Sequence, residues 1–217
     1  MKRTRLRGRG SDEGFTLVEL ILAIIIIGVI TVPLADIVIG YLKNVDATNA
    51  RLIESHDVQI ASAYWAQDVA SIGTRSATSP YPLTQSVETN VAYGSSLYPC
   101  GAAGTTPVAT LAWDDSTGPG ATTLVRVAYL IVTVSGQTEL HRLRCNGSAT
   151  TPVSDVTVAH NLDPLTPPKV TCSGTSGVDC ATAPAVPRTV TLTLTLKNAG
   201  NRDTAYVVLL TGQRRQS

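Results

Sequence analysis

The chain begins with a long apolar segment that contrasts with the residues around it. From Phe15 to Ala35 the sequence reads FTLVELILAIIIIGVITVPLA, and Glu19 is its single charged side chain. At about 1.5 Å per residue, a helix of this length spans a hydrocarbon core of roughly 30 Å. A secretory signal peptide has a shorter apolar run, of about 7–15 residues, that ends at small residues. The apolar character continues to Ile39, so we expect a transmembrane helix over residues 15–39.

The position of Glu19 inside this segment needs a physical explanation. A carboxylate near the end of a membrane helix costs up to a few kcal/mol when it has no partner. Either Glu19 pairs with a positive group, or its side chain reaches the headgroup region from its place near the start of the segment. Physical reasoning alone leaves both interpretations open.

Two residues that modify helices lie in the second half of the segment. Gly28 allows a neighbouring helix to approach closely, and Pro33 removes one backbone hydrogen bond and favours a kink. The range 28–33 is therefore a candidate flexible stretch. A kink that the helix simply tolerates is the alternative.

Beyond the membrane segment, residues 40–72 mix polar and apolar positions, which predicts an amphipathic continuation of the same helix. The apolar positions at helical spacing are Val45, Leu52, Ile60 and Ala63. We expect this face to contact a globular domain, with His56 as a packed or edge histidine rather than a metal ligand. Gly73 and the Thr/Ser/Pro-rich residues after it predict the end of the helix.

The remainder, residues 73–217, carries the signals of strands and loops. β-branched and alternating runs predict strands over Thr122–Val134, Thr138–Cys145, Thr189–Leu196 and Thr204–Thr211. Ser135-Gly136 between the first two predicts a hairpin. Gly, Thr, Pro and Ser concentrate near 99–107, 147–152, 163–168 and 173–187, which predicts loops. The expected fold class is α+β, with a long N-terminal helix packed on a C-terminal antiparallel β-sheet domain.

Charged residues are unevenly distributed along the chain, with a basic cluster at the N-terminus. The net charge of the 217 residues is +1, which gives no overall electrostatic footprint for nucleic acid. Five basic residues nevertheless crowd the first ten positions: Lys2, Arg3, Arg5, Arg7 and Arg9. This asymmetry predicts a cytoplasmic N-terminus and a C-terminal domain outside the membrane.

The four cysteines, Cys100, Cys145, Cys172 and Cys180, all follow the apolar segment. An even number in the part expected outside the membrane suits disulfides, and three connectivities are possible. We favour Cys172–Cys180, closing a short loop, and Cys100–Cys145 as a long-range link. Four buried free thiols are the alternative. A zinc site fits less well, because there is no Cys-x-x-Cys pair and the histidines lack ligand spacing.

Residues Gly14-Phe15-Thr16-Leu17-Val18-Glu19-Leu20, followed by a full-length apolar run, resemble the processing site of type IV prepilins and pseudopilins. The resemblance implies that residues 1–14 are a leader peptide and that a membrane peptidase cuts between Gly14 and Phe15. It implies that Phe15 becomes N-methylated. Glu19 would then be the fifth mature residue, whose carboxylate neutralises the new amine of a neighbouring subunit in a filament.

The same resemblance implies a pilin fold and a structural rather than enzymatic function, without a cofactor. The implied partners are other pilins, the prepilin peptidase, the membrane assembly platform and the lipid bilayer; a separate cytoplasmic ATPase would supply the force. The segment Tyr64–Val69, the hairpin ending at Leu140-His141-Arg142 and the end at Gly212–Arg215 are similar, more loosely, to J-type minor pseudopilins and W-type minor pilins. A minor pilin or pseudopilin is therefore expected.

Rival functions come from other classes. A DNA-binding pilin of an uptake filament is the first alternative, although Arg214-Arg215 supply only a small electrostatic contribution. A membrane-anchored enzyme is the second, but the sequence has no Gly-x-Ser-x-Gly, phosphate loop or His-Glu-x-x-His motif. A major pilin or adhesin is the third. Asp114-Asp115 is a possible metal-ligand pair, though a surface turn is the preferred interpretation, and no metal site is predicted.

Overall fold

The computed structural model describes residue 14 and residues 16–118, 121–173, 180, 186–197 and 206–216. The chain divides into two compact units, Met1–Asp46 and Ala47–Ser217. Helix α1 (Leu17–Ser71) contributes to both of them. Of the expected leader, only Gly14 belongs to the described residues.

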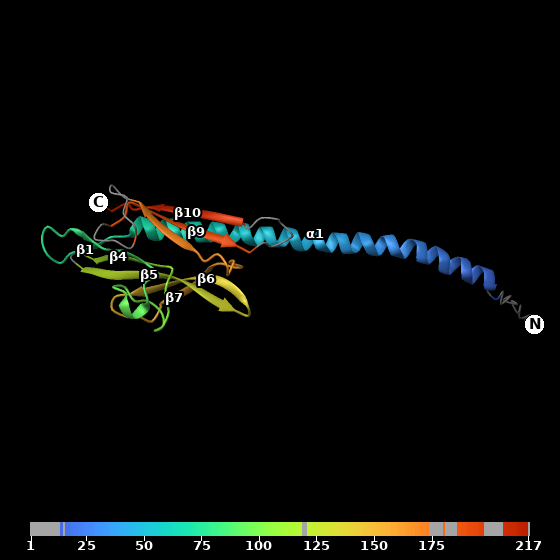
Figure 1. Ribbon diagram of the computed structural model, residues 1–217, viewed down its shortest axis with the longest axis horizontal. Helices are drawn as coiled ribbons and strands as arrows, with labels where there is room; N and C mark the ends of the chain where they lie inside the picture. Colours follow the sequence, from blue (N-terminus) through green and yellow to red (C-terminus); the bar gives the residue numbers. More distant parts are fainter. Residues whose placement is uncertain are drawn as a thin grey trace, which may run out of the picture. The chain divides into compact units, whose positions relative to one another are not determined.

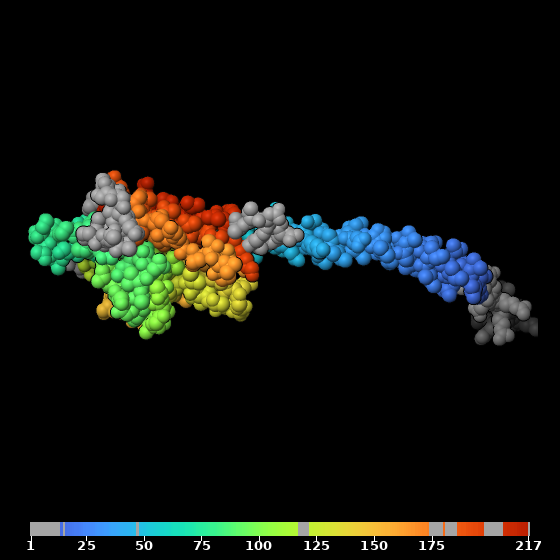
Figure 2. Space-filling view, in the orientation of Figure 1, coloured from blue at the N-terminus to red at the C-terminus, as the bar shows by residue number. Residues whose placement is uncertain are grey.

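In the first unit, α1 carries apolar side chains on all sides. The large apolar residues between Leu17 and Leu42 are 48% to 73% exposed and form the blue stretch in Figure 2. The helix continues through Gly28 and Pro33, where the sequence suggested an interruption. The Thr31 hydroxyl donates to the carbonyl of Ile27 at 2.8 Å in this stretch. Flexibility between residues 28 and 33 stays a prediction.

The second unit contains the strands, and all their pairings are antiparallel. A two-stranded sheet pairs β1 (Thr74–Arg75) with β2 (Leu83–Thr84). A five-stranded sheet has the order β3-β4-β5-β6-β7, with strands Val87–Thr89, Ala109–Gly118, Ala121–Val134, Gln137–Asn146 and Ser154–Ala159. A three-stranded sheet has the order β10-β9-β8, with strands Tyr206–Gln213, Thr189–Leu196 and Lys169–Ser173. The short 3₁₀-helix η1 covers Tyr93–Ser95. The expected α+β class is confirmed.

The hairpin predicted around residue 135 is present as β5 and β6. Ser135 and Gly136 have φ values of 51° and 81°, the positive pair that a two-residue type I′ turn requires. Strand β9 has the predicted bounds, and its apolar residues Val190, Leu192, Leu194 and Leu196 face the core. Strand β10 begins at Tyr206; residues 204–205 of the predicted strand lie outside the described residues.

The core of the second unit forms where α1 meets the two larger sheets. Figure 1 shows β9 and β10 along one side of this part of α1 and β4 to β7 along the other. Ala61, Trp65, Val69 and Ile72 lie at helical spacing and are almost fully buried. The Trp65 indole contacts both sheets, because its Nε1 donates to the carbonyl of Val190 at 3.1 Å and its ring meets Tyr129 edge-on with centroids 5.0 Å apart.

The helix face expected from the sequence is only partly correct: Ile60 packs against the core, but His56 is exposed and not packed. Leu52 is 63% exposed and Ala63 is exposed, whereas the buried face contains the acidic residues Glu54, Asp57 and Asp68. Acidic residues on the buried face disguise its periodicity, because a hydrophobic pattern counts them as solvent-facing.

The interpretation of Asp114-Asp115 as a surface turn is also wrong. Both residues lie in β4, and Asp114 Oδ2 accepts a hydrogen bond from the backbone N–H of Arg75 at 2.7 Å. Strands β1, β2, β3, β4, β7 and β8 were not predicted. Five of them have two to six residues each, which is too short for an alternating pattern to stand out from loop sequence. Strand β4 has ten residues, but the interpretation of Asp114-Asp115 as a turn concealed it.

The close approach of β10 to α1 requires a glycine. A Cβ added at Gly212 would lie 2.4 Å from the Cβ of Val69 and within 3 Å of both its methyl groups. Val69 is fully buried, so its side chain has no open space into which it can move. Gly212 therefore sets the distance between the last strand and the helix.

Gly212→Ala should destabilise the second unit by about 1–3 kcal/mol, because the added methyl overpacks this contact. Gly94 is the matched control: a Cβ there meets nothing within 4 Å, so Gly94→Ala should be neutral. Thermal unfolding of the full chain in detergent, followed by near-ultraviolet circular dichroism, measures both. Equal melting temperatures for the two variants would refute the packing argument.

Candidate functional site

The predicted processing motif lies at the start of α1. Gly14 is exposed, and a Cβ added to it would meet nothing within 4 Å. Thr16 precedes the first helical residue, Leu17. The Glu19 Oε2 atom accepts hydrogen bonds from the Thr16 backbone N–H at 3.2 Å and from the Thr16 hydroxyl at 3.1 Å. The Glu19 N–H donates in return to Thr16 Oγ1 at 3.3 Å.

This reciprocal arrangement is a capping box, in which residue N3 bonds back to the N-cap. It satisfies free N–H groups at the start of the helix, where a carboxylate is also favoured by the helix dipole. Both Thr16 bonds end on Oε2, and no described residue donates to Oε1. One carboxylate oxygen therefore stays open to a group from another chain. The Thr-x-x-Glu spacing is a readable signal of this cap that our sequence reasoning missed.

Phe15, between Gly14 and Thr16, lies outside the described residues, as do residues 1–13 with their basic cluster. Cleavage at Gly14 and methylation of Phe15 therefore stay predictions. If the cut occurs there, the new amine is adjacent in sequence to the N-cap residue of α1.

Two disulfides hold the second unit. Cys100 is joined to Cys145, across 45 residues, and Cys172 to Cys180, across 8 residues, which is the pairing that the sequence analysis favoured. Closing a loop of 45 residues reduces the entropy of the unfolded chain by an amount worth about 4 kcal/mol in the loop-closure model. The first bridge ties the segment before β4 to the end of β6.

A buried ion pair connects α1 to the five-stranded sheet. Arg142 on β6 donates from Nε to Asp68 Oδ2 at 2.7 Å and from Nη2 to Asp68 Oδ1 at 2.5 Å, a bidentate geometry. The Tyr129 hydroxyl on β5 donates to Asp68 Oδ2 at 2.7 Å. The Arg142 guanidinium also lies over the Tyr64 ring, with Cζ 4.8 Å from its centroid. The Asp68 carboxylate therefore accepts hydrogen bonds from side chains of two strands, β5 and β6.

The pKa values follow from this burial. Burial raises the pKa of Tyr129 well above its ordinary value, and the charge and hydrogen bond of Asp68 raise it further. For Arg142, burial acts to lower the pKa, but the hydrogen bond and charge of Asp68 outweigh it, so the pKa is raised. Tyr129 therefore stays neutral and Arg142 stays charged across the physiological range.

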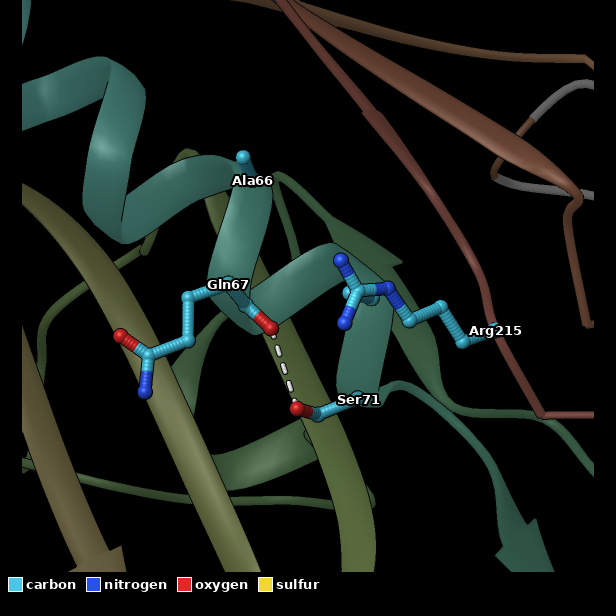
Figure 3. Close-up of a pocket in the computed structure, with 5 residues that line it drawn as sticks. Ala66, Gln67, Ser71 and Arg215 are labelled. Carbon is cyan, nitrogen blue, oxygen red and sulfur yellow. Dashed lines mark hydrogen bonds between the residues drawn. The ribbon is translucent and has the colours of Figure 1, made fainter.

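The C-terminal end of α1 borders a shallow pocket, which Figure 3 shows beside the last turn. Ala66, Gln67, Ala70, Ser71 and Arg215 line it. The Arg215 N–H donates to the carbonyl of Ala70 at 3.0 Å and the Gln216 side-chain amide donates to that of Ser71 at 3.0 Å, so the C-terminal segment caps the helix. Arg215 is the one charged residue among those that line the pocket. The lining therefore contains no pair of an acid and a base for catalysis.

Removing Asp68 should be among the most costly single changes in the second unit. Asp68→Ala leaves the Arg142 charge and the Tyr129 hydroxyl buried without their partner, and we expect a loss of about 3–5 kcal/mol. Asp155, whose side chain is 55% exposed beside His141, is the matched control. Asp155→Ala should cost less than about 1 kcal/mol. Melting temperatures of the full chain in detergent test this, and similar losses for the two variants would contradict it.

The raised pKa of Tyr129 predicts a loss of stability in alkali. In the unfolded chain this phenol ionises near pH 10, so its contribution is complete below about pH 10 and falls as the pH rises from there. Tyr129→Phe should cost about 1–3 kcal/mol near neutral pH through the lost hydrogen bond. The difference between wild type and variant should then shrink in alkali. Urea midpoints across the alkaline range measure it, and a constant difference would exclude this linkage.

Comparison with known proteins bears on the N-terminal segment alone. Residues 9–35 match the family described as the prokaryotic N-terminal methylation motif. The matched range contains Gly14, Phe15 and Glu19 and most of the exposed apolar part of α1. No curated protein matches the chain. Among the described residues, α1 is the one helix that is long and apolar enough to cross a membrane.

Proposed function

We propose that this chain, whose methylation motif supports a type IV pilin-like or pseudopilin subunit, is a minor pilin or pseudopilin of a type IV pilus or type II secretion-like filament. Prepilin peptidase cuts between Gly14 and Phe15 and methylates Phe15. The mature chain waits in the membrane with its second unit outside, and the assembly platform then moves it into the filament. Its function is structural.

The observation that carries this proposal is the geometry of Glu19. Its carboxylate is held at the N-terminal end of α1 by Thr16, and Oε1 is open among the described residues. The Phe15 amine created by cleavage needs an anionic partner once it leaves the headgroups for an apolar bundle. Glu19 of a neighbouring subunit supplies that partner, so that neither charge is buried alone.

The exposed apolar part of α1 fits the two environments of the proposed function, first the lipid bilayer and then a bundle of neighbouring helices. Its large apolar side chains face outward on every side, as in a helix that is covered by lipid or by other helices. Gly28, with nothing near its missing side chain, permits close approach of a neighbouring helix. Pro33 leaves one carbonyl of the preceding turn without its helical donor, so residues 28–33 are where α1 unwinds most easily on assembly.

The second unit supports a minor rather than a major subunit. It carries long loops and two disulfides, which suits a position at the filament tip or in its initiation. The J-type pseudopilins and W-type minor pilins are the proposed subtype. Processing is tested by mass spectrometry of the mature chain, which should begin with N-methylphenylalanine at position 15.

Glu19→Ala should be cleaved and inserted like the wild type but should enter filaments at least about tenfold less, because the amine of its neighbour is left unpaired. Thr16→Ala separates this role from capping: it removes the hydroxyl of the capping box and keeps the carboxylate. It should therefore enter filaments far better than Glu19→Ala. Quantitative immunoblotting of sheared filaments and membranes gives both ratios.

Two results would contradict the proposed pairing of Glu19 with the Phe15 amine. One is normal incorporation of Glu19→Ala. The other is an equal defect in Thr16→Ala, which would assign the effect to the helix cap.

A further inference from the structure

A second charged position lies inside the exposed apolar part of α1. Asp36 is exposed, and its apolar neighbours Leu34, Ile37, Val38 and Ile39 are exposed as well. No described residue of the chain forms a hydrogen bond or ion pair with the Asp36 carboxylate. An acid surrounded by apolar side chains in a membrane helix marks a functional contact by default.

Asp36 can remain hydrated as long as the subunit is in the membrane. It lies 21 residues after Phe15, which is about 31 Å along a helix and therefore at the far boundary of the hydrocarbon core. The headgroup region solvates it there. In a helical bundle that contact with water is lost, and the carboxylate requires a cation.

Lys43 is the one cation available in this part of the chain. It is the only Lys or Arg between residues 14 and 50. Seven residues separate it from Asp36, which is two helical turns, so both side chains lie on one face of α1 about 10.5 Å apart along the axis. Gly40 lies between them on the same face, and a Cβ there would meet nothing within 4 Å. Within one chain, Asp36 and Lys43 form no ion pair in the described structure.

The proposed Glu19 contact sets a register that brings these charges together in neighbouring copies. If the Phe15 amine of one copy is level with Glu19 of the next, parallel helices are displaced by four residues, about 6 Å. Asp36 of the first copy is then level with Gly40 of the second, where the missing side chain leaves room. Lys43 of the second copy lies about 4.5 Å further along the axis, within reach of its long side chain.

We propose that α1 docks against a second copy of this chain through the stripe Asp36, Gly40 and Lys43, with the Asp36 carboxylate of one copy paired to the Lys43 ammonium of the next. This contact rests on the proposed filament function. It adds a second pair of opposite charges, near the outer end of the membrane segment, to the proposed pair of the Phe15 amine and Glu19. Two oppositely charged pairs at different heights limit the axial displacement. A slip of one turn in either direction separates Phe15 from Glu19, and a slip that shortens the displacement also separates Asp36 from Lys43. The proposal therefore also requires that the tip or initiation complex contains at least two consecutive copies of this chain.

Charge exchange tests the proposal in full-length chains expressed in cells that assemble the filament. Asp36→Lys alone and Lys43→Asp alone should each reduce the fraction of subunit in sheared filaments by about tenfold, because like charges then meet in an apolar bundle. The Asp36→Lys/Lys43→Asp double variant should recover most of the loss. Asp46 is the matched control, an acid three residues beyond Lys43 in a polar stretch, and Asp46→Asn should assemble normally.

Co-expression of the two single variants distinguishes a contact between chains from one within a chain. An Asp36→Lys copy next to a Lys43→Asp copy restores opposite charges at both junctions, so the mixture should assemble better than either variant alone. A cysteine pair gives a second measurement: Asp36→Cys in one copy and Lys43→Cys in another should be joined by a short bifunctional thiol reagent. The native cysteines are all in disulfides and do not compete.

The outcomes separate this contact from the function on which it rests. Wild-type levels of both single variants, with Glu19→Ala still defective, would overturn the Asp36–Lys43 contact and leave the filament function intact. Defective single variants without rescue by co-expression would show that a different protein supplies the partner charge, which also overturns a second copy as the occupant. A wild-type chain that is absent from filaments would overturn both.

Discussion

The second unit depends on the packing of one helix side chain, Trp65, against two sheets at once. Its ring contacts Tyr129 in the five-stranded sheet and its indole N–H bonds to Val190 in the three-stranded sheet. Without this helix, each sheet would expose the apolar face that it now buries. The last turns of α1 are therefore the shared core of the second unit, and the contact at Gly212 shows how closely the last strand follows them.

The buried ion pair of Asp68 and Arg142 determines how α1 is oriented on the five-stranded sheet. Burying two charges costs desolvation energy that their attraction roughly offsets, so the pair is a weak source of net stability. Its bidentate geometry nevertheless fits only one rotation of α1 about its own axis and one axial position of α1 along β6. Tyr129 contributes to the same effect from the neighbouring strand. The apolar contacts supply the free energy of docking, and the ion pair selects its register.

In the first unit the apolar side chains of α1 are exposed, whereas the second unit buries its apolar faces. No described residue covers this apolar surface. Glu19 already has a local function there as part of the capping box, which the Thr16-x-x-Glu19 spacing encodes. Under the proposed function, a carboxylate that caps its own helix and keeps one oxygen open serves both the monomer in the membrane and the assembled filament. Among the described residues Asp36 has no such local partner, and in the proposed docking its charge is paired only when helices assemble.

The sequence by itself determined the long apolar helix, the α+β class, the β5–β6 hairpin and strand β9, because each depends on a run of residues whose periodicity is local. The N-terminal methylation motif, which matches residues 9–35, was equally readable because its residues are contiguous. Tertiary structure decided the rest. Which face of α1 is buried depends on Asp68 meeting Arg142, seventy-four residues away, and no local pattern can report that an acidic side chain has a distant partner. The short strands were decided in the same way, because their hydrogen bonds come from neighbours in space rather than from their own sequence.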